Sequence, residues 1–288
     1  MKVIDVHTHG MGGLDTSAAS EDQILEIARL QRAAGVDEIV LTLYPAPVDA
    51  MRRAMTCVRK AMEIQKATPG GQQDGSKIIG VHLEGPFLNP SQCGALNADA
   101  LMEPRRHTLD RLISGFEDMV RIMTLAPELD GAVDVIRLIA DRGIVASMGH
   151  SEATCTEAEA GFHSGARGIT HLFNAMRGIH HREPGIAGFG LMNRDIYVEV
   201  IADPFHLDSR MIELIFDVKD PGKVLIVSDS VRDSKTGAHP EGIRGSGSKL
   251  LGGSMPIRES AERLIAMGMD EQRVMAAITV NPEQYLTL

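Results

Sequence analysis

Apolar runs rich in β-branched residues recur along the chain, and each is followed by a segment with the spacing of an amphipathic helix. Eight of these runs are predicted to be strands: 3–9, 37–43, 77–84, 119–126, 143–149, 167–172, 196–202 and 223–229. Helices are predicted at 20–34, 48–66, 108–116, 131–141, 154–164, 208–217 and 256–268. This alternation indicates an α/β fold with a parallel sheet.

The length of the chain separates two parallel-sheet folds. Eight alternations in 288 residues, about 36 residues each, match a (β/α)8 TIM barrel, which typically needs about 250 residues. A doubly wound open sheet is the alternative. No linker-like segment divides the chain, so residues 1–288 are expected to form a single barrel domain.

Local signals support the individual elements. In the first predicted helix, Ser20 can cap the first turn, an apolar face includes Ile24 and Ile27, and Gly35 follows the last turn. Two glycine-rich loops stand out, 68–76 and 230–254. The second directly follows the last predicted strand, where a barrel places active-site loops, so it is either a lid or a flexible surface loop.

Composition narrows the class of partner. The net charge of −10 argues against a nucleic acid or a membrane surface bound by bulk electrostatics, although a small anion needs only a local basic pocket. The three cysteines lie far apart and match neither a disulfide framework nor a thiolate metal site. With no signal peptide and no run long enough to cross a bilayer, we expect a cytoplasmic protein that lacks membrane segments.

Two histidines near the start of the chain raise the first chemical question. In "VIDVHTHG", residues 3–10, strand geometry places Asp5, His7 and His9 on one face and Val6 and Thr8 on the other. A pair of imidazoles on one strand face can bind a metal, form a hydrogen-bonded polar cluster, or end a strand at the solvent. The pair alone leaves these possibilities open.

Other ligand-type residues fall at the ends of other predicted strands. Glu84 ends the third strand, His150 the fifth, His171 the sixth and Asp229 the eighth. Each alone fits a hydrogen-bonded core residue or a helix cap, but the carboxyl ends of barrel strands converge on one mouth. Together with the pair at the first strand, they form the arrangement that a hydrolytic metal site needs.

The donor set indicates which metal fits. Imidazoles and carboxylates without a thiolate favour zinc, with iron(II) or manganese as alternatives. Asp229 beside the metal can accept the proton of an attacking water. His82 lies two residues before Glu84 on the same strand face and is interpreted as support for the ligands rather than as a ligand.

Motifs along nearly the whole chain resemble those of a known family. "VIDVHTHG", "GVHLEGPF", "LAPE", "GHSEAT", "THLFNAM", "REPG", "IADPFH" and "SDS" occur in the order found in the N-acetylglucosamine-6-phosphate deacetylase family of the amidohydrolase superfamily. This order is far more specific than any one of the motifs. The resemblance implies a metal-dependent deacetylase acting on an amino sugar phosphate.

The resemblance also implies roles for individual residues. Glu84, His150 and His171 would hold the principal metal, and His7 and His9 would complete a second position that only some members fill. Asp229 would be the general acid and base. The implied substrate-binding residues are Ala95, Asn174, Ala175, Arg182, His206, Leu251, Gly252 and Gly253. Arg182 would reach the site of a neighbouring subunit, which implies a homodimer.

The chain departs from the family pattern in three places. A histidine that contacts the sugar in "KGAHN" is replaced by Leu96 in "CGALNAD". The segment after "LLGGS" continues with Pro256, Ile257 and Arg258 in place of Leu-Thr-Met. The family's small β-sandwich uses both chain ends, and we expect it to be lacking because the metal motif begins at His7 and the chain stops soon after "NPEQ".

The leading hypothesis is therefore a metal-dependent hydrolase of an N-acylated amino sugar phosphate. One rival is a metal-dependent phosphodiesterase or nuclease, because barrel nucleases also open with a His-x-His strand; the acidic charge weighs against it. Another rival is a non-catalytic regulator that binds a sugar phosphate, which Leu96 makes plausible and Asp229 opposes.

Overall fold

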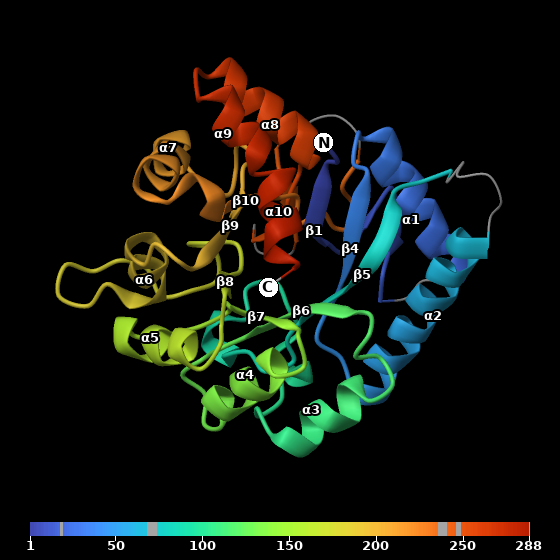
Figure 1. Ribbon diagram of the computed structural model, residues 1–288, viewed down its shortest axis with the longest axis horizontal. Helices are drawn as coiled ribbons and strands as arrows, with labels where there is room; N and C mark the ends of the chain where they lie inside the picture. The colour runs from blue at the N-terminus through green and yellow to red at the C-terminus, as the bar shows by residue number, and fades with distance from the viewer. Residues whose placement is uncertain (18–19, 68–73, 236–240, 246–248, 288) are drawn as a thin grey trace.

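Eight parallel strands form the centre of the molecule. The computed structural model describes residues 1–17, 20–67, 74–235, 241–245 and 249–287 (Figure 1). The strands pair in the order β1 (Ile4–Thr8), β4 (Glu38–Leu43), β5 (Lys77–Glu84), β6 (Val120–Leu125), β7 (Val145–Met148), β8 (Gly168–Ile169), β9 (Tyr197–Ile201) and β10 (Val224–Val227). All eight predicted strands are confirmed within a few residues.

The first and last strands close the sheet into a barrel. A parallel bridge joins Thr8 to Ser230, and the backbone N–H of Asp229 donates to the carbonyl of His7 at 2.9 Å. The (β/α)8 barrel is thereby confirmed and the doubly wound sheet is excluded. The closure also brings the ends of β1 and β10 together, which places Asp229 beside the His-x-His pair.

The predicted helices surround the barrel (Figure 1). They are α1 (Glu21–Ala33), α2 (Val48–Ala67), α3 (Arg106–Ile113), α4 (Ala132–Ala140), α5 (Cys155–His163), α7 (Ser209–Val218) and α8 (Ile257–Ala266). The expected cap of α1 is a complete capping box, in which the Ser20 hydroxyl accepts from the N–H of Gln23 and the Gln23 side chain accepts from the N–H of Ser20. Among the described helices, none has both the length and the apolar character needed to cross a bilayer.

Three helices escaped the prediction for identifiable reasons. α6 (Gly185–Met192) has the sequence GIAGFGLM, and six of its eight residues are buried, so it shows no alternation of apolar and polar faces. α9 (Glu271–Ala276) and α10 (Val280–Tyr285) have six residues each, too few for a periodic pattern to emerge. α10 also contains Pro282, which usually marks a break.

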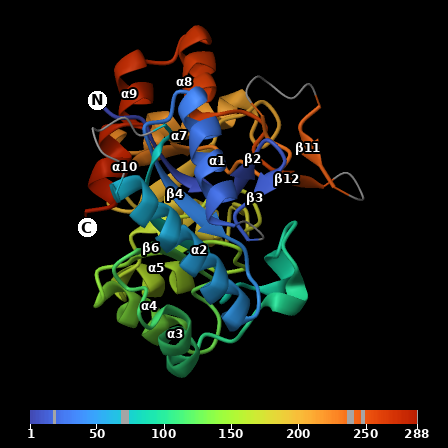
Figure 2. The same ribbon diagram turned by 90° about the vertical axis from the view of Figure 1, so that its right-hand side faces the viewer.

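The two ends of the barrel carry different additions (Figure 2). At one end lie the hairpins β2 (Gly10–Met11) with β3 (Leu14–Asp15) and β11 (Ile243–Arg244) with β12 (Leu250–Gly252); at the other lies α10. Short 3-10 helices occupy Pro90–Gln92, Ala98–Ala100 and Pro221–Lys223. Of the two glycine-rich loops, 68–73, 236–240 and 246–248 lie outside the described residues; the described part of 230–254 includes the β11–β12 hairpin. No β-sandwich occurs among the described residues.

Side chains of the barrel strands and of the C-terminal helix fill the interior of the barrel. Its apolar cluster includes Ile4, Val6, Val40, Ile122, Val145, Tyr197, Ile201, Leu225, Val227 and Tyr285. Tyr285 of α10 is fully buried, and its ring lies 4.9 Å from that of Tyr197 on β9. The last helix therefore closes one end of the barrel with apolar packing.

We expect Tyr285→Ala to lower the free energy of unfolding by about 3–5 kcal/mol, because it removes a large buried aromatic side chain and leaves a cavity. Tyr285→Phe keeps the ring and should change it by less than about 1.5 kcal/mol. Urea denaturation followed by circular dichroism measures both. Equal stability of the two variants would show that the ring does not support the barrel.

Candidate metal centre

An irregularity in β1 aims the first two imidazoles. The pairing of β1 with β4 shifts register between Asp5 and Thr8, so the strict alternation expected for residues 5–9 is wrong. Ile4 and Val6 both lie in the barrel interior, yet His7 also points into the barrel mouth. Asp5 accepts the N–H groups of His7 and Ser228, and burial raises the pKa of its carboxyl to about 6.

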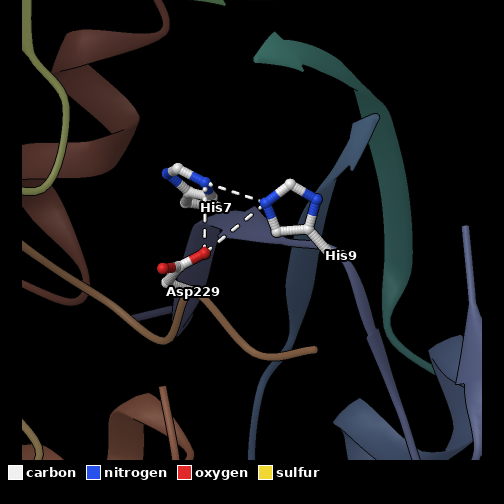
Figure 3. A group of neighbouring side chains, drawn as sticks. All are labelled: His7, His9 and Asp229. Carbon is white, nitrogen blue, oxygen red and sulfur yellow. Dashed lines mark hydrogen bonds and ion pairs between the residues drawn. The ribbon is translucent and has the colours of Figure 1, made fainter. Parts of the chain in front are cut away.

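His7, His9 and Asp229 converge on one point (Figure 3). The Nε2 atoms of His7 and His9 are 3.3 Å apart, and Asp229 Oδ1 lies 3.4 Å from the first and 3.5 Å from the second. Both imidazoles are buried, and the Asp229 side chain is only 13% exposed. Three ligand-type atoms therefore face one another at spacings that suit a shared cation.

Glu84, His150 and His171 form a second such group. Glu84 Oε1 lies 3.1 Å from His150 Nε2 and 3.0 Å from His171 Nε2, and these two nitrogens are 3.1 Å apart. The other oxygen of Glu84, Oε2, lies 3.1 Å from His9 Nε2. Glu84 at the end of β5 therefore stands between the two groups and touches both.

The donor set fits a divalent metal. Four imidazole nitrogens and two carboxylates face one another with little access to water, which is costly unless a cation lies among them. Burial favours the neutral form of His7, but the carboxylates of Asp229, Glu84 and Glu199 outweigh it and hold the pKa of His7 well above its usual value. The residues present thus favour a positive charge at this position.

The backbone at the site is held in an unusual conformation. Among the residues that the structure describes, five non-glycine residues have a positive φ, and three of them are His150, His171 and Asp229, at 49°, 31° and 46°. The other two are Phe173 and Ala175, in the turn after His171. Such residues cost of order 1–3 kcal/mol each and cluster where function fixes a side chain. Their concentration here marks this end of the barrel as the functional one.

A pocket of about 160 Å³ opens over the cluster. Its walls contain the ligand-type residues His9, Glu84, His150, His171 and Asp229. They also contain Tyr44, Gly94, Ala95, Leu96, Asn174, Ala175, Ile201, His206, Leu250, Leu251 and Gly252. Of the substrate-binding residues expected from the sequence, six therefore line the pocket: Ala95, Asn174, Ala175, His206, Leu251 and Gly252.

The two remaining predicted residues lie outside this lining. The N–H of Gly253 donates to the carbonyl of Asp229 at 2.8 Å, and an added Cβ on Gly253 would meet the carbonyl of Ser228 at 1.7 Å, so only glycine fits. Arg182 lies on an exposed turn, where its guanidinium contacts the His181 ring at 2.8 Å. The structure therefore does not bring Arg182 to the pocket of its own chain.

Three residues at the site were not anticipated. The ring of Tyr44 stacks on His9 at 3.8 Å between centroids. Glu199 of β9 lies 3.0 Å from His7 Nδ1. Asp203 accepts from His206, and hydrogen bonds hold the pKa of its carboxyl well below the usual value despite burial. Tyr44 and Asp203 each follow a predicted strand within two residues, a signal that the sequence does offer.

His82 has the supporting position that the sequence suggested. Its ring meets His7 edge-on at 4.6 Å, and its Nε2 lies 2.7 Å from the Thr124 hydroxyl. That hydroxyl continues to Thr170 at 2.7 Å and then to Ser147 at 2.7 Å. Burial and the neighbouring histidines hold the pKa of His82 well below its usual value, so it lies beneath the ligands as a neutral ring.

A larger hollow of about 460 Å³ lies at the other end of the barrel. It is lined by the start of β5 at Lys77 and by Arg59, Lys66 and Asp118, and Asp118 pairs with Arg59. Active sites of barrels lie at the carboxyl ends of the strands, so the smaller pocket is the functional one despite its size. The strained backbone supports the same choice.

This barrel gathers imidazoles and carboxylates at the carboxyl ends of its strands, and its relatives place it in the amidohydrolase class of (β/α)8 barrels. No family model matches the chain. It is 35% identical to N-acetylglucosamine-6-phosphate deacetylase of Vibrio furnissii over 74% of this chain and 51% of that protein. It is 32% identical to the protein of that name from Bos taurus, over 99% of this chain and 73% of the other.

A solved structure gives the same result. N-acetyl-D-glucosamine-6-phosphate deacetylase from Mycobacterium smegmatis superimposes with a TM-score of 0.89 and 28% identity, covering 100% of this chain and 78% of that one. The chain belongs to the N-acetylglucosamine-6-phosphate deacetylase family. By sequence alignment it spans about half the length of the Vibrio furnissii relative, 51%.

Proposed function

We propose that this chain is a metal-dependent hydrolase that removes an acyl group, acetyl above all, from an N-acylated amino sugar phosphate such as N-acetylglucosamine 6-phosphate. One observation carries the proposal: Asp229 lines the pocket and lies 3.4 Å from Nε2 of His7, so its carboxylate faces both the ligands and the substrate space. The family relationship supports the substrate class.

Two ion positions follow from the ligand groups. Glu84, His150 and His171 would hold one divalent ion, and His7, His9 and Asp229 a second, with Glu84 between them. When bound, such an ion acidifies a water and polarises an amide carbonyl. Imidazole and carboxylate donors without a thiolate favour zinc, with iron(II) and manganese as alternatives.

Asp229 moves the proton in the proposed reaction. Its carboxylate accepts a proton as the water oxygen bonds to the carbonyl carbon, and it then gives this proton to the sugar nitrogen as the C–N bond breaks. For acetyl, the products are acetate and the amino sugar phosphate. Asp229 lines the pocket, so its carboxylate is accessible to a water and to the substrate amide for both steps.

The substrate would lie against the remaining pocket residues. Asn174 and His206 offer polar side chains, and Ala95, Ala175, Leu251 and Gly252 offer backbone and surface along its length. Gly253 would act from behind the pocket, through its hydrogen bond to the carbonyl of Asp229. Arg182 lies on an exposed turn with His180 and His181. This position supports a role in binding the phosphate group of a substrate that lies in the pocket of a neighbouring subunit. We therefore propose a homodimer in which Arg182 completes the partner's site.

Residues 1–288 would act as one catalytic domain, and we propose a cytoplasmic location. The three cysteines are free in the structure, which suits a reducing compartment. We propose neither a nucleic acid nor a membrane as a partner.

Acetate release tests the proposed function. The metal-loaded chain is assayed with N-acetylglucosamine 6-phosphate, N-acetylgalactosamine 6-phosphate and longer N-acyl analogues, with and without a chelator. We expect chelator-sensitive release from at least one of them. A metal-loaded protein that releases no acid from any amide contradicts the proposal; binding of sugar phosphate without turnover would favour the regulator, and cleavage of phosphodiesters the nuclease.

Asp203 should matter for substrate binding because it orients His206. Its two oxygens lie 3.0 Å from His206 Nδ1, and its Oδ1 also accepts the N–H groups of Phe205 and His206. We expect Asp203→Asn to raise KM about tenfold, since a hydrogen bond to a charged group contributes about 1.5–3 kcal/mol, and to change kcat much less. Steady-state acetate release measures both constants.

Asp208 provides the matched control. It lies on the same segment and caps α7 through the N–H of Arg210, a role that asparagine also fills. Asp208→Asn should leave KM within about twofold of the unmodified chain, a difference below about 0.5 kcal/mol. If the Asp203→Asn variant has the same KM as the unmodified chain, then either His206 does not contact the substrate or Asp203 does not orient His206.

A further inference from the structure

The carboxylate of Glu199 lies directly behind one ligand of the metal centre. Glu199 Oε2 is 3.0 Å from Nδ1 of His7, and both side chains are at most 1% exposed. On the other side of the same ring, Nε2 faces His9 and Asp229. His7 thus joins the pocket side of the barrel to a carboxylate that the pocket does not reach.

This contact decides which nitrogen of His7 carries the proton. The geometry suits donation of the Nδ1 N–H to the carboxylate of Glu199, since carboxylate oxygens accept hydrogen bonds. In the singly protonated ring that can bind a metal, Nε2 is then the nitrogen with the lone pair, and it faces His9 and Asp229. A carboxylate behind a histidine also raises the basicity of the nitrogen that faces the metal.

The other imidazoles of the two groups have weaker support or none. Nδ1 of His150 lies 2.8 Å from the backbone carbonyl of Gln92, which is neutral. Among the described residues, Nδ1 of His9 and Nδ1 of His171 are buried without a hydrogen-bond partner. His7 is therefore the ligand with a charged group behind it in the part of the chain that the structure describes.

Glu199 has little structural reason to be buried here. Its second oxygen, Oε1, is buried with no hydrogen-bond partner among the described residues, so the His7 ring is the one side chain there that hydrogen-bonds this carboxylate, although a ring nitrogen of His82 lies within 4.8 Å of it. Burying a carboxylate with incomplete pairing costs several kcal/mol, and an apolar residue would serve the barrel interior better. The free-energy cost of burying Glu199 has a functional reason if the negative charge of its carboxylate strengthens ion binding by His7.

We propose that Glu199 is a positioning residue that strengthens ion binding at the position formed by His7, His9 and Asp229, and not at the position formed by Glu84, His150 and His171. This rests on the proposed function, which places divalent ions at both. Removing such an outer carboxylate typically weakens a metal site 10- to 100-fold. Full occupancy of the second position would then depend on a residue that touches neither ion nor substrate.

Zinc binding tests this on the full-length, metal-depleted chain. Zn²⁺ is titrated in competition with a chromophoric chelator, and bound metal is counted by elemental analysis. The variants are Glu199→Leu, which removes the acceptor, and Glu199→Gln, whose amide oxygen can still accept from His7 Nδ1 but carries no charge. Glu38→Gln is the matched control. Glu38 is a buried carboxylate that pairs with Lys2, and it lies at the first residue of β4, at the end of the barrel opposite the metal centre.

We expect two equivalents of zinc in the unmodified chain and in Glu38→Gln. Glu199→Leu should bind the first equivalent unchanged and the second about 10- to 100-fold more weakly, with Glu199→Gln between them. Circular dichroism and the midpoint of thermal unfolding confirm that each variant is folded. Because Glu199→Gln keeps the shape of the side chain, it gives a result even if Glu199→Leu does not fold.

Three results would overturn the inference: variants that bind both equivalents as the unmodified chain does, variants that lose both equivalents together, or an unmodified chain that binds a single ion. The proposed function fails differently, when the chain loaded with zinc releases no acid from any amide. A chain that deacetylates normally but binds its second ion independently of Glu199 would contradict the inference alone.

Discussion

Asp229→Asn is expected to lower kcat for acetate release by about 10³-fold, with little change in KM. Proton transfer by a positioned side chain typically contributes 10²- to 10⁴-fold, and an amide cannot accept the proton that the carboxylate of Asp229 takes. The substitution preserves the size of a side chain whose backbone is held at a φ of 46°. Asparagine tolerates this conformation, so the barrel should remain intact.

The assay needs two controls, one for metal and one for charge. Asp229 also belongs to a ligand group, so zinc content is measured on the same samples, and the comparison is made at equal occupancy. Asp233→Asn makes the same change at an exposed position four residues further along, and should leave kcat within about twofold, below about 0.5 kcal/mol. If the Asp229→Asn variant is as active as the unmodified chain, Asp229 does not transfer the proton.

The barrel could be predicted because its strands are short, apolar and regularly spaced. Each predicted strand corresponds to an observed one, and the order of pairing follows the order in the chain. Helices with one buried face were equally visible, as α1 shows with Ile24, Ile27 and Ala28. α6 was invisible because nearly all of it is buried, so its pattern carries no period.

The site could be predicted only as far as strand ends reveal it. His150, His171 and Asp229 were found because each follows an apolar run, and barrel topology alone brings such positions together. The positive φ of these residues was not foreseeable, because none of the three positions is a glycine, the residue that usually signals this conformation. The positions of residues at strand ends in the sequence do not give the distances between them. The place of Glu84 between the two ligand groups could therefore be seen only in the structure.

Residues that act through another residue were harder to find. Glu199 sits inside the predicted strand 196–202, where a charged residue reads as an interruption of an apolar run. Its contact with His7 joins positions 192 residues apart in the chain. The β1 irregularity is similar: nothing in "VIDVHTHG" distinguishes a regular strand from one whose register shifts, yet that shift aims His7.

The largest effect is expected at Glu84, the residue that both ligand groups share. Its Oε1 faces His150 and His171, and its Oε2 faces His9, so Glu84→Gln weakens both positions at once. An amide oxygen is a poorer ligand than a carboxylate, and the buried imidazoles would lose the negative charge that holds a cation among them. We expect zinc binding to fall at both positions.

Activity should fall with the metal, by about 10⁴-fold or more. A bound ion contributes several kcal/mol of transition-state stabilisation, and each 1.36 kcal/mol is tenfold in rate. Zinc content and acetate release are measured on the same preparations, with Glu38→Gln as the control at the far end of the barrel. A Glu84→Gln variant that keeps two ions would contradict the shared role of this carboxylate. Because Asp229→Asn is expected to lose rate at equal metal occupancy whereas Glu84→Gln loses rate through the metal, the pair separates proton transfer from ion binding.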